Sequence, residues 1–238
     1  MTDQNATGED LRTAAFFDKN QPTYPPARLD FVIEALANAT EDQKLIDVGA
    51  GDGQTLRHLL ANTPITDVTG LDVSEKYAEV MRTELGCDAL CGSILDRGFV
   101  SQHAGQYDYV VIAAVLHHIV GSTRKESIAF AEEAVRNCLE LVRPGGKLFI
   151  YEPCYEPQQV LTGVFWIKRL LSKVLPGRLE VGPSWLNFGE PIVSYYSPER
   201  VEEMVRKAGA TGERIQVRNP RRLGGLIKRS PIGLVIEP

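Results

Sequence analysis

The sequence is poor in cysteine, and its cysteines form no metal-binding or disulfide pattern. Only four occur among 238 residues, namely Cys87, Cys91, Cys138 and Cys154. They include no Cys-x-x-Cys pair and no partner histidines at zinc spacing, so neither a disulfide framework nor a structural metal site is indicated. We therefore expect free thiols and no bound metal.

Long apolar runs are missing as well. Charged residues interrupt every strongly apolar stretch before it reaches the ~18–20 residues that a membrane span needs. The first ten residues, MTDQNATGED, are acidic and lack the basic and apolar regions of a signal peptide. We expect a soluble, cytoplasmic protein. Its composition, 43% hydrophobic and 24% charged, excludes a disordered or fibrous chain.

Positive charge is scarce overall but concentrated near the C-terminus. The chain has a formal net charge of −5. Between Arg206 and Arg229, eight basic residues accompany a single acid, Glu213, which leaves −12 for the rest of the chain. Such an asymmetry is found in proteins that attract an anionic substrate, a nucleic acid or an anionic membrane surface, and also in ordinary solvated faces.

Apolar runs bounded by turn residues alternate with segments of helical period, and no repeat or flexible linker divides the chain. This alternation predicts a parallel sheet covered by helices. The expected strands are Lys44–Val48, Asp67–Asp72, Asp88–Cys91, Tyr107–Ala114, Lys147–Glu152, Arg214–Val217 and Ile232–Ile236. The expected helices run from Pro25 to about Asn38, after Gly53, from Glu75 to Leu85, from Ser122 or Thr123 to Val142, and from Pro198 to about Ala208.

The alternation fails after Glu152, where a basic amphipathic helix is predicted. Apolar residues recur at helical spacing between Val160 and Leu175, and the basic residues are assigned to the other side. These basic residues are Lys168, Arg169 and Lys173. A Pro/Gly-rich loop containing Trp185 and Phe188 follows. We expect a lid beside the sheet, although the same stripe also fits a core helix or a helix that rests on a membrane.

The most informative segment is LIDVGAGDG, residues 45–53, in which a buried strand enters a glycine-rich turn. Glycines at such a turn let a ligand approach the backbone closely. Asp72 ends the next strand, 19 positions after Gly53. An acid at that place reaches the two hydroxyls of an adenosine ribose.

Asp47 and Asp52 distinguish between adenosine cofactors. A dinucleotide places its pyrophosphate over this turn, and two carboxylates there would repel it. S-adenosylmethionine instead brings a protonated amine and a sulfonium, which carboxylates favour. The two acids therefore favour S-adenosylmethionine over a dinucleotide and over a turn without a ligand.

Four segments in this order resemble the motifs of the class I S-adenosylmethionine-dependent methyltransferases. They are LIDVGAGDG, VTGLDVS, QYDYVVIAAVLHHI and LVRPGGKLFIYEP. The earlier segment FFDKNQPTYPPARL is similar to the one that folds over the cofactor in this family. The resemblance covers residues 16–152. It implies an α/β, Rossmann-like fold: a seven-stranded, mostly parallel sheet with the last strand antiparallel and helices on both faces.

The resemblance also implies a cofactor site. Asp47 would contact the methionine part, Asp72 the ribose, and Val73 the adenine. The full set of implied cofactor residues is Tyr24, Asp47, Gly49, Gly51, Asp72, Val73, Ser93, Ile94 and Ala113. We expect one domain in four parts: residues 1–40 cover the cofactor, 41–154 bind it, 155–196 form the substrate lid, and 197–238 add a helix and strands.

A methyl acceptor that reacts through oxygen usually needs a base. His117 and His118 follow the fourth strand and Glu152 ends the fifth, so all three belong at the carboxyl edge of the sheet, where ligands bind in this architecture. We predict that one of the two histidines is the general base and that Glu152 orients it or holds the substrate. The alternative is that the histidines only pack the loop.

The predicted acceptor is a small molecule, either a natural product or a lipid-like compound, methylated on a hydroxyl or carboxylate. No Asn or Asp followed by Pro-Pro and an aromatic residue follows the fourth strand, where amine methylation would use it. Cys154 lies near the place of the nucleophile in cytosine-5 methylation, which leaves RNA as a less favoured substrate. The open alternatives are an RNA methyltransferase that uses the basic C-terminal region, a non-catalytic cofactor-binding partner, and peripheral membrane contact.

Overall fold

A computed structural model describes residues 25–174, 192–215, 217, 220–223 and 227–238. The sequence predictions for Tyr24, Trp185 and Phe188 lie outside these described residues. Within the described ranges, no helix combines the length and the apolar character that crossing a bilayer requires.

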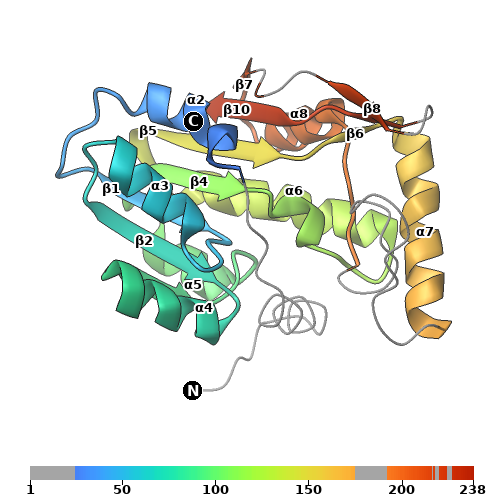
Figure 1. Ribbon diagram of the computed structural model, residues 1–238, viewed down its shortest axis with the longest axis horizontal. Helices are drawn as coiled ribbons and strands as arrows, with labels where there is room; N and C mark the ends of the chain where they lie inside the picture. The colour runs from blue at the N-terminus through green and yellow to red at the C-terminus, as the bar shows by residue number, and fades with distance from the viewer. Residues whose placement is uncertain (1–24, 175–191, 216, 218–219, 224–226) are drawn as a thin grey trace.

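A seven-stranded sheet forms the centre of the molecule, in the order β3-β2-β1-β4-β5-β10-β7 (Figure 1). Its strands are β1 (Lys44–Val48), β2 (Asp67–Asp72), β3 (Asp88–Cys91), β4 (Tyr107–Ala113), β5 (Val142–Glu152), β7 (Gly212–Ile215) and β10 (Ile232–Ile236). Strands β1 to β5 pair in parallel, whereas β10 runs antiparallel to both of its neighbours. The predicted Rossmann-like α/β fold with an antiparallel last strand is confirmed.

Helices cover both faces of this sheet. The first face carries η1 (Pro26–Leu29), α2 (Asp30–Ala35), α3 (Gln54–Asn62), α4 (Glu75–Val80) and its π-helical continuation η2 (Met81–Leu85). The second face carries α5 (Arg97–His103), α6 (Arg124–Leu141) and α8 (Pro198–Lys207). Side chains alternate along each strand, so that Leu45 packs on the first face and Ile46 on the second. Burial on both faces explains why the strands read as nearly continuous apolar runs.

The helix starts follow the capping residues in the sequence. Ser74 and Ser197 each accept a hydrogen bond from a backbone N–H of the first turn, and Thr123 forms a capping box with Glu126. Helix α5 was not predicted. It has only seven residues, which is too short for a clear helical period, although Asp96 caps it.

Strand β5 begins earlier than predicted, at Val142 instead of Lys147. Val142 pairs with Tyr107, and the register shifts before Tyr109 meets Lys147. At Gly146 a Cβ atom would lie 2.4 Å from the carbonyl oxygen of Asp108. The absence of a side chain at Gly146 therefore permits this bulge against β4.

A second, three-stranded sheet lies beside the first and was not predicted. Its strands are β6 (Tyr155–Glu156), β8 (Arg221–Leu223) and β9 (Ile227–Arg229). β9 pairs antiparallel with both of the others. Strands of two or three residues carry no readable alternation, and their pairing joins segments about 70 residues apart in the sequence.

Helix α7 (Gln158–Val174) stands at the end of the molecule toward which the arrows of β4 and β5 point (Figure 1). The assignment of Lys168 to the side opposite the apolar residues is wrong. Lys168 is buried, at 2% exposure, on the same face as Leu161 and Phe165. The large apolar side chains exposed on this helix are Trp166 (48%), Ile167 (52%) and Leu170 (65%). Lys168 follows Leu161 by seven positions and Phe165 by three, so the helical period itself places it on their face.

Candidate active site

The glycine turn after β1 contains three glycines with positive φ, Gly49, Gly51 and Gly53. Two of them are needed for the protein's own packing. A Cβ atom at Gly49 would lie 2.4 Å from Val115, and one at Gly53 would lie 2.3 Å from Leu85. At Gly51 a Cβ atom would meet nothing within 4 Å. Gly51 is therefore the position at which a ligand can come closest to the backbone.

Asp47 lies at the base of this turn and is almost completely buried, at 1% exposure. Neither of its carboxylate oxygens has a hydrogen-bond partner in the described part of the chain. Burial, opposed by the charge of Arg28 and assisted by the negative charge of Asp72, raises the pKa of Asp47 to about 8. A buried carboxyl group without a partner is costly unless a ligand supplies one. The group is suited to a cationic part of a ligand.

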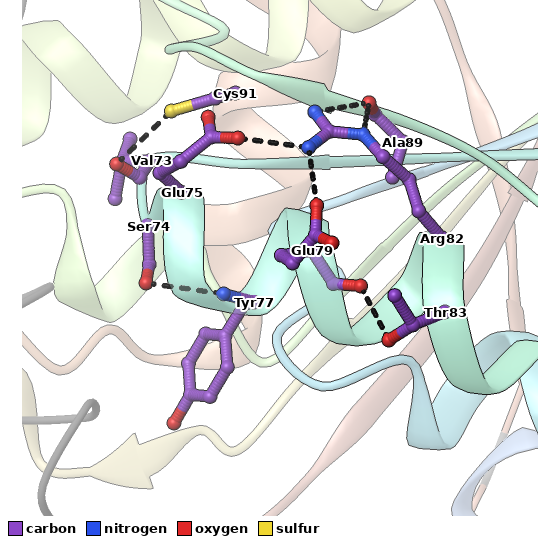
Figure 2. Close-up of polar contacts among 9 residues, drawn as sticks. All are labelled: Val73, Ser74, Glu75, Tyr77, Glu79, Arg82, Thr83, Ala89 and Cys91. Carbon is purple, nitrogen blue, oxygen red and sulfur yellow. Dashed lines mark hydrogen bonds and ion pairs between the residues drawn. The ribbon is translucent and has the colours of Figure 1, made fainter.

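Asp72 ends β2 on the other side of the glycine turn. Its Oδ2 accepts a hydrogen bond from the Gly51 N–H at 2.8 Å, and its Oδ1 accepts one from the Ser74 N–H at 2.9 Å. Hydrogen bonds also hold the turn that follows β2, between Val73 and Tyr77. Figure 2 shows the thiol of Cys91 donating to the Val73 carbonyl and the Ser74 hydroxyl accepting from the Tyr77 N–H. Asp72 and Val73 are thus fixed relative to the glycine turn.

The remaining predicted cofactor residues lie at the ends of β3 and β4. Ser93 is buried, and its Oγ accepts from the Leu95 N–H at 3.2 Å, so its O–H remains able to donate. Ile94 packs in the core of the second face, where its carbonyl accepts from Asn137 at 2.8 Å. Ala113 is the last residue of β4. The contacts expected between these residues and a cofactor stay predictions.

His117 and Glu152 form a buried pair at the ends of β4 and β5. The Nδ1 atom of His117 lies 2.5 Å from Oε1 of Glu152, although the residues are 35 positions apart. Ala114, with φ of 61°, turns the chain after β4 into the 3₁₀-helix η3 (Leu116–His118) that carries the histidine. The second oxygen of Glu152, Oε2, has no hydrogen-bond partner among the described residues.

Burial favours the neutral forms of both members of this pair. It raises the pKa of Glu152 to about 8, which the N–H groups of Leu116 and His117 partly oppose. It lowers the pKa of His117 to about 3, and the positive charge of Lys168 adds to this effect. In the neutral pair, the protonated Glu152 donates to Nδ1 and the single ring proton of His117 lies on Nε2. When the pair loses one proton, Nδ1–H donates to the Glu152 carboxylate and Nε2 becomes free to accept a proton.

Three residues around His117 were not predicted to lie beside it: Arg124, Lys168 and Tyr195. The ring of Tyr195 stacks on that of His117 at 5.1 Å between centroids. Arg124 holds the Tyr195 segment in place, because its guanidinium donates to the Ser194 hydroxyl and to the Tyr195 carbonyl. These contacts join positions about 70 residues apart, which no local pattern connects.

His118 also borders this group. Its ring centroid lies 4.0 Å from that of His117, and burial, followed by the charges of His117 and Lys168, lowers its pKa. The described residues place only His117 beside Glu152. The geometry therefore favours His117 over His118 as the candidate base.

Three of the basic residues near the C-terminus pair with acids in the described structure. Lys207, Arg214 and Lys228 lie on α8, β7 and β9 and pair with acids at 2.7, 3.4 and 3.2 Å. Those acids, Glu132, Glu202 and Glu156, all lie outside the basic segment. The local excess of positive charge in the sequence is thus partly neutralised by tertiary contacts.

Comparison with known proteins agrees with this architecture. Residues 46–148 match the family described as a methyltransferase domain. The ubiquinone biosynthesis O-methyltransferase of Bordetella avium (strain 197N) is 30% identical over 154 residues, which are 62% of this chain and 59% of that protein. The protein of the same name from Escherichia coli O9:H4 (strain HS) is 29% identical over 66% of this chain and 61% of its own length. This chain thus spans about three fifths of these curated relatives.

Solved structures give the same fold. Geranyl diphosphate C-methyltransferase from Streptomyces coelicolor A3(2), in complex with Mg2+, geranyl diphosphate and S-adenosyl-L-homocysteine, has a TM-score of 0.65 over 98% of this chain and 99% of that one. An O-methyltransferase family protein from Burkholderia thailandensis has a TM-score of 0.56 over 96% of this chain and 60% of that one. The sequence identities are 11% and 16%, so these likenesses establish the fold alone.

The sheet order and the glycine turn define a Rossmann-like α/β protein with a ligand site at the carboxyl edge of its strands. The sequence matches add that residues 46–148 resemble a methyltransferase domain. The fold is the one found in class I S-adenosylmethionine-dependent methyltransferases.

Proposed function

We propose that this protein is an S-adenosylmethionine-dependent O-methyltransferase that acts on a hydroxyl group of a small, hydrophobic or lipid-like molecule. The observation that carries the proposal is the buried His117–Glu152 pair at the ends of β4 and β5. A histidine oriented by a carboxylate is suited to remove the proton of a hydroxyl group. The names of the two relatives, both O-methyltransferases, support an oxygen acceptor.

The residues around the glycine turn fit the cofactor. Asp47 offers a buried carboxylate to the methionine amine, and Asp72 stands where an acid reaches the ribose hydroxyls. Gly51 leaves open space above the backbone. When bound, S-adenosylmethionine supplies an electrophilic methyl group on a positively charged sulfur.

The chain's own residues have two tasks in this proposal. His117 accepts the hydroxyl proton at Nε2 while Glu152 holds the opposite side of the ring. Helix α7 and Tyr195, which belong to the predicted lid, lie around the acceptor and exclude water from it. Alignment of acceptor and methyl group accounts for much of the rate in such displacements.

The first test concerns Gly51. We expect G51A to fold, because a Cβ atom there meets open space, and a left-handed alanine costs about 1–2 kcal/mol. That cost corresponds to a fall in Tm of about 2–8 °C. Cofactor binding should fall at least tenfold, since the methyl group occupies the space proposed for the ligand. Calorimetric titration with S-adenosylhomocysteine measures both proteins, and absence of binding to the wild type would refute the proposed function.

A second test uses the buried acid. At pH 6.5 Asp47 is protonated in the free protein, because its pKa is about 8, and the cofactor's amine is charged. Binding should therefore release about one proton as the carboxylate forms, and affinity should increase as the pH rises from 6 toward 8. D47N should bind S-adenosylhomocysteine about tenfold more weakly and release no proton.

Calorimetry in buffers of different ionisation enthalpy counts the protons released. The matched control is D67N, at the exposed start of β2, where affinity and proton release should equal those of the wild type. Equal proton release by the wild type and D47N would exclude Asp47 from the amine site.

A further inference from the structure

We infer that Lys168 stabilises the ionised form of the acceptor's hydroxyl group, and hence that the acceptor is a phenol or a comparably acidic hydroxyl compound. This inference rests on the proposed function and names the substrate class of the same site. It assigns to α7 a residue that contacts the acceptor, in addition to the base His117.

The first observation is that α7 buries a lysine. Lys168 lies inside, at 2% exposure, on the same face as Leu161 and Phe165, while Trp166, Ile167 and Leu170 lie outside. An ammonium group loses much of its hydration on burial, and the cost is several kcal/mol. Departures from the ordinary pattern of burial concentrate at functional sites.

The second observation is where the buried lysine lies. Its Nζ is 5.7 Å from the centroid of the Tyr195 ring, and the same ring stacks on His117. Its charge reaches both His117 and His118, because it lowers the pKa of each. Lys168 and the His117–Glu152 pair thus belong to one buried group of side chains.

The chemistry follows from these positions. The acceptor's O–H bond breaks, and His117 takes the proton at Nε2. The oxygen keeps the electron pair and becomes an oxyanion, which Lys168 stabilises without giving up its own proton. The oxygen then forms a bond to the methyl carbon as the sulfur–methyl bond breaks, and the charges of the oxyanion and the sulfonium cancel.

A phenol matches this arrangement better than an aliphatic alcohol. One nearby positive charge lowers the pKa of a phenol far enough for a histidine to accept its proton near neutral pH. The pKa of an aliphatic alcohol is too high for this. An apolar cluster of Tyr155, Leu161 and Ile227, with Tyr195 packed against it, lies beside the same segment and suits an aromatic ring.

The test uses 4-nitrophenol, whose absorption shifts into the visible when it ionises. It is titrated against pH in the presence of the holo protein saturated with S-adenosylhomocysteine. We expect the wild type to bind nitrophenol and to lower its pKa. K168M should raise the pKa of the bound probe by about one unit and weaken nitrophenolate binding about tenfold or more. K168R, which keeps the charge, should retain part of the effect, and K125M, at an exposed position of α6, should behave as the wild type.

Thermal unfolding separates this role from a structural one. Replacing a buried charge by an apolar side chain of similar size often leaves stability unchanged or raises it, so K168M should keep its Tm while losing the effect on the probe. The inference is overturned if the probe does not bind the wild type, if its pKa is the same in the wild type and K168M, or if K168M and K168Q both fail to fold. Calorimetry with S-adenosylhomocysteine tests the proposed function independently, because Lys168 is not part of the glycine turn.

Discussion

Substitution of His117 by alanine is expected to lower the single-turnover rate of methyl transfer by about 10²-fold or more. Its ring is the one that contacts Glu152, at 2.5 Å, and it is the one on which Tyr195 stacks. The loss should appear in the chemical step and not in cofactor affinity, since His117 lies outside the glycine turn. Rapid-quench measurement with saturating cofactor and a phenolic acceptor reads the step directly.

The pH dependence of the methyl-transfer rate distinguishes the buried His117–Glu152 pair from an exposed histidine. An exposed histidine would give a rate that rises near pH 6.5. Here burial holds the proton on Glu152 until about pH 8. Below that pH the ring of His117 is neutral, but its single proton lies on Nε2, so this nitrogen cannot act as a base. The rate should therefore rise with pH and level off above about 8. E152Q cannot ionise, so it should lose this rise and show a rate between those of the wild type and H117A.

H118A is the matched control for this prediction. The two rings are adjacent, at 4.0 Å between centroids, but the described contacts connect only His117 to Glu152. H118A should therefore retain most of the single-turnover rate and the rise toward pH 8. Rates near that of the wild type in both histidine variants would show that transfer proceeds by alignment alone and that the pair is structural.

Substitution of Asp72 by alanine is expected to weaken S-adenosylhomocysteine binding by about 10²-fold or more. Two hydrogen bonds from ribose hydroxyls to a carboxylate contribute roughly 1.5–3 kcal/mol each, and 1.4 kcal/mol is a tenfold change in affinity. The structure adds a second reason. Asp72 also accepts hydrogen bonds from Gly51 and Ser74, so its loss releases the glycine turn as well as the ligand.

D72N separates these two contributions. Asparagine keeps one acceptor oxygen for the backbone but removes the negative charge, so its affinity should lie between those of the wild type and D72A. D67N, at the other end of the same strand, controls for a general change of charge. Unchanged calorimetric affinity in D72A would remove Asp72 from the ribose site.

Most of the fold could be predicted because its signals are local. A buried strand that enters a glycine turn, a capping residue before a helix and an acid at a strand end are each read within about ten residues. Three of the five parallel strands, β1, β2 and β3, begin and end where the sequence predicts. Helix α5 and the second sheet were missed because their elements are too short for periodicity to appear.

The candidate site was predictable only in part. Residues at the ends of parallel strands meet at one edge of the sheet, so Asp47, Asp72 and Glu152 could be assigned to that edge from the sequence. The choice of His117 over His118 depends on a side-chain contact across 35 positions. Arg124 and Tyr195 depend on contacts across about 70 positions, which no residue pattern records.

The amino-acid sequence by itself determined the α/β class, the order of the first strands and helices, the glycine turn and the resemblance to the methyltransferase family, because these depend on periodicity, turn chemistry and short motifs. Tertiary structure alone decided which histidine meets Glu152, how the C-terminal basic residues are neutralised, and which face of α7 is buried. The physical reason is the same in each case. A helical period specifies which side chains lie together, whereas the surface that packs against them is built by distant parts of the chain. For Lys168, that surface is the group around His117 and Tyr195.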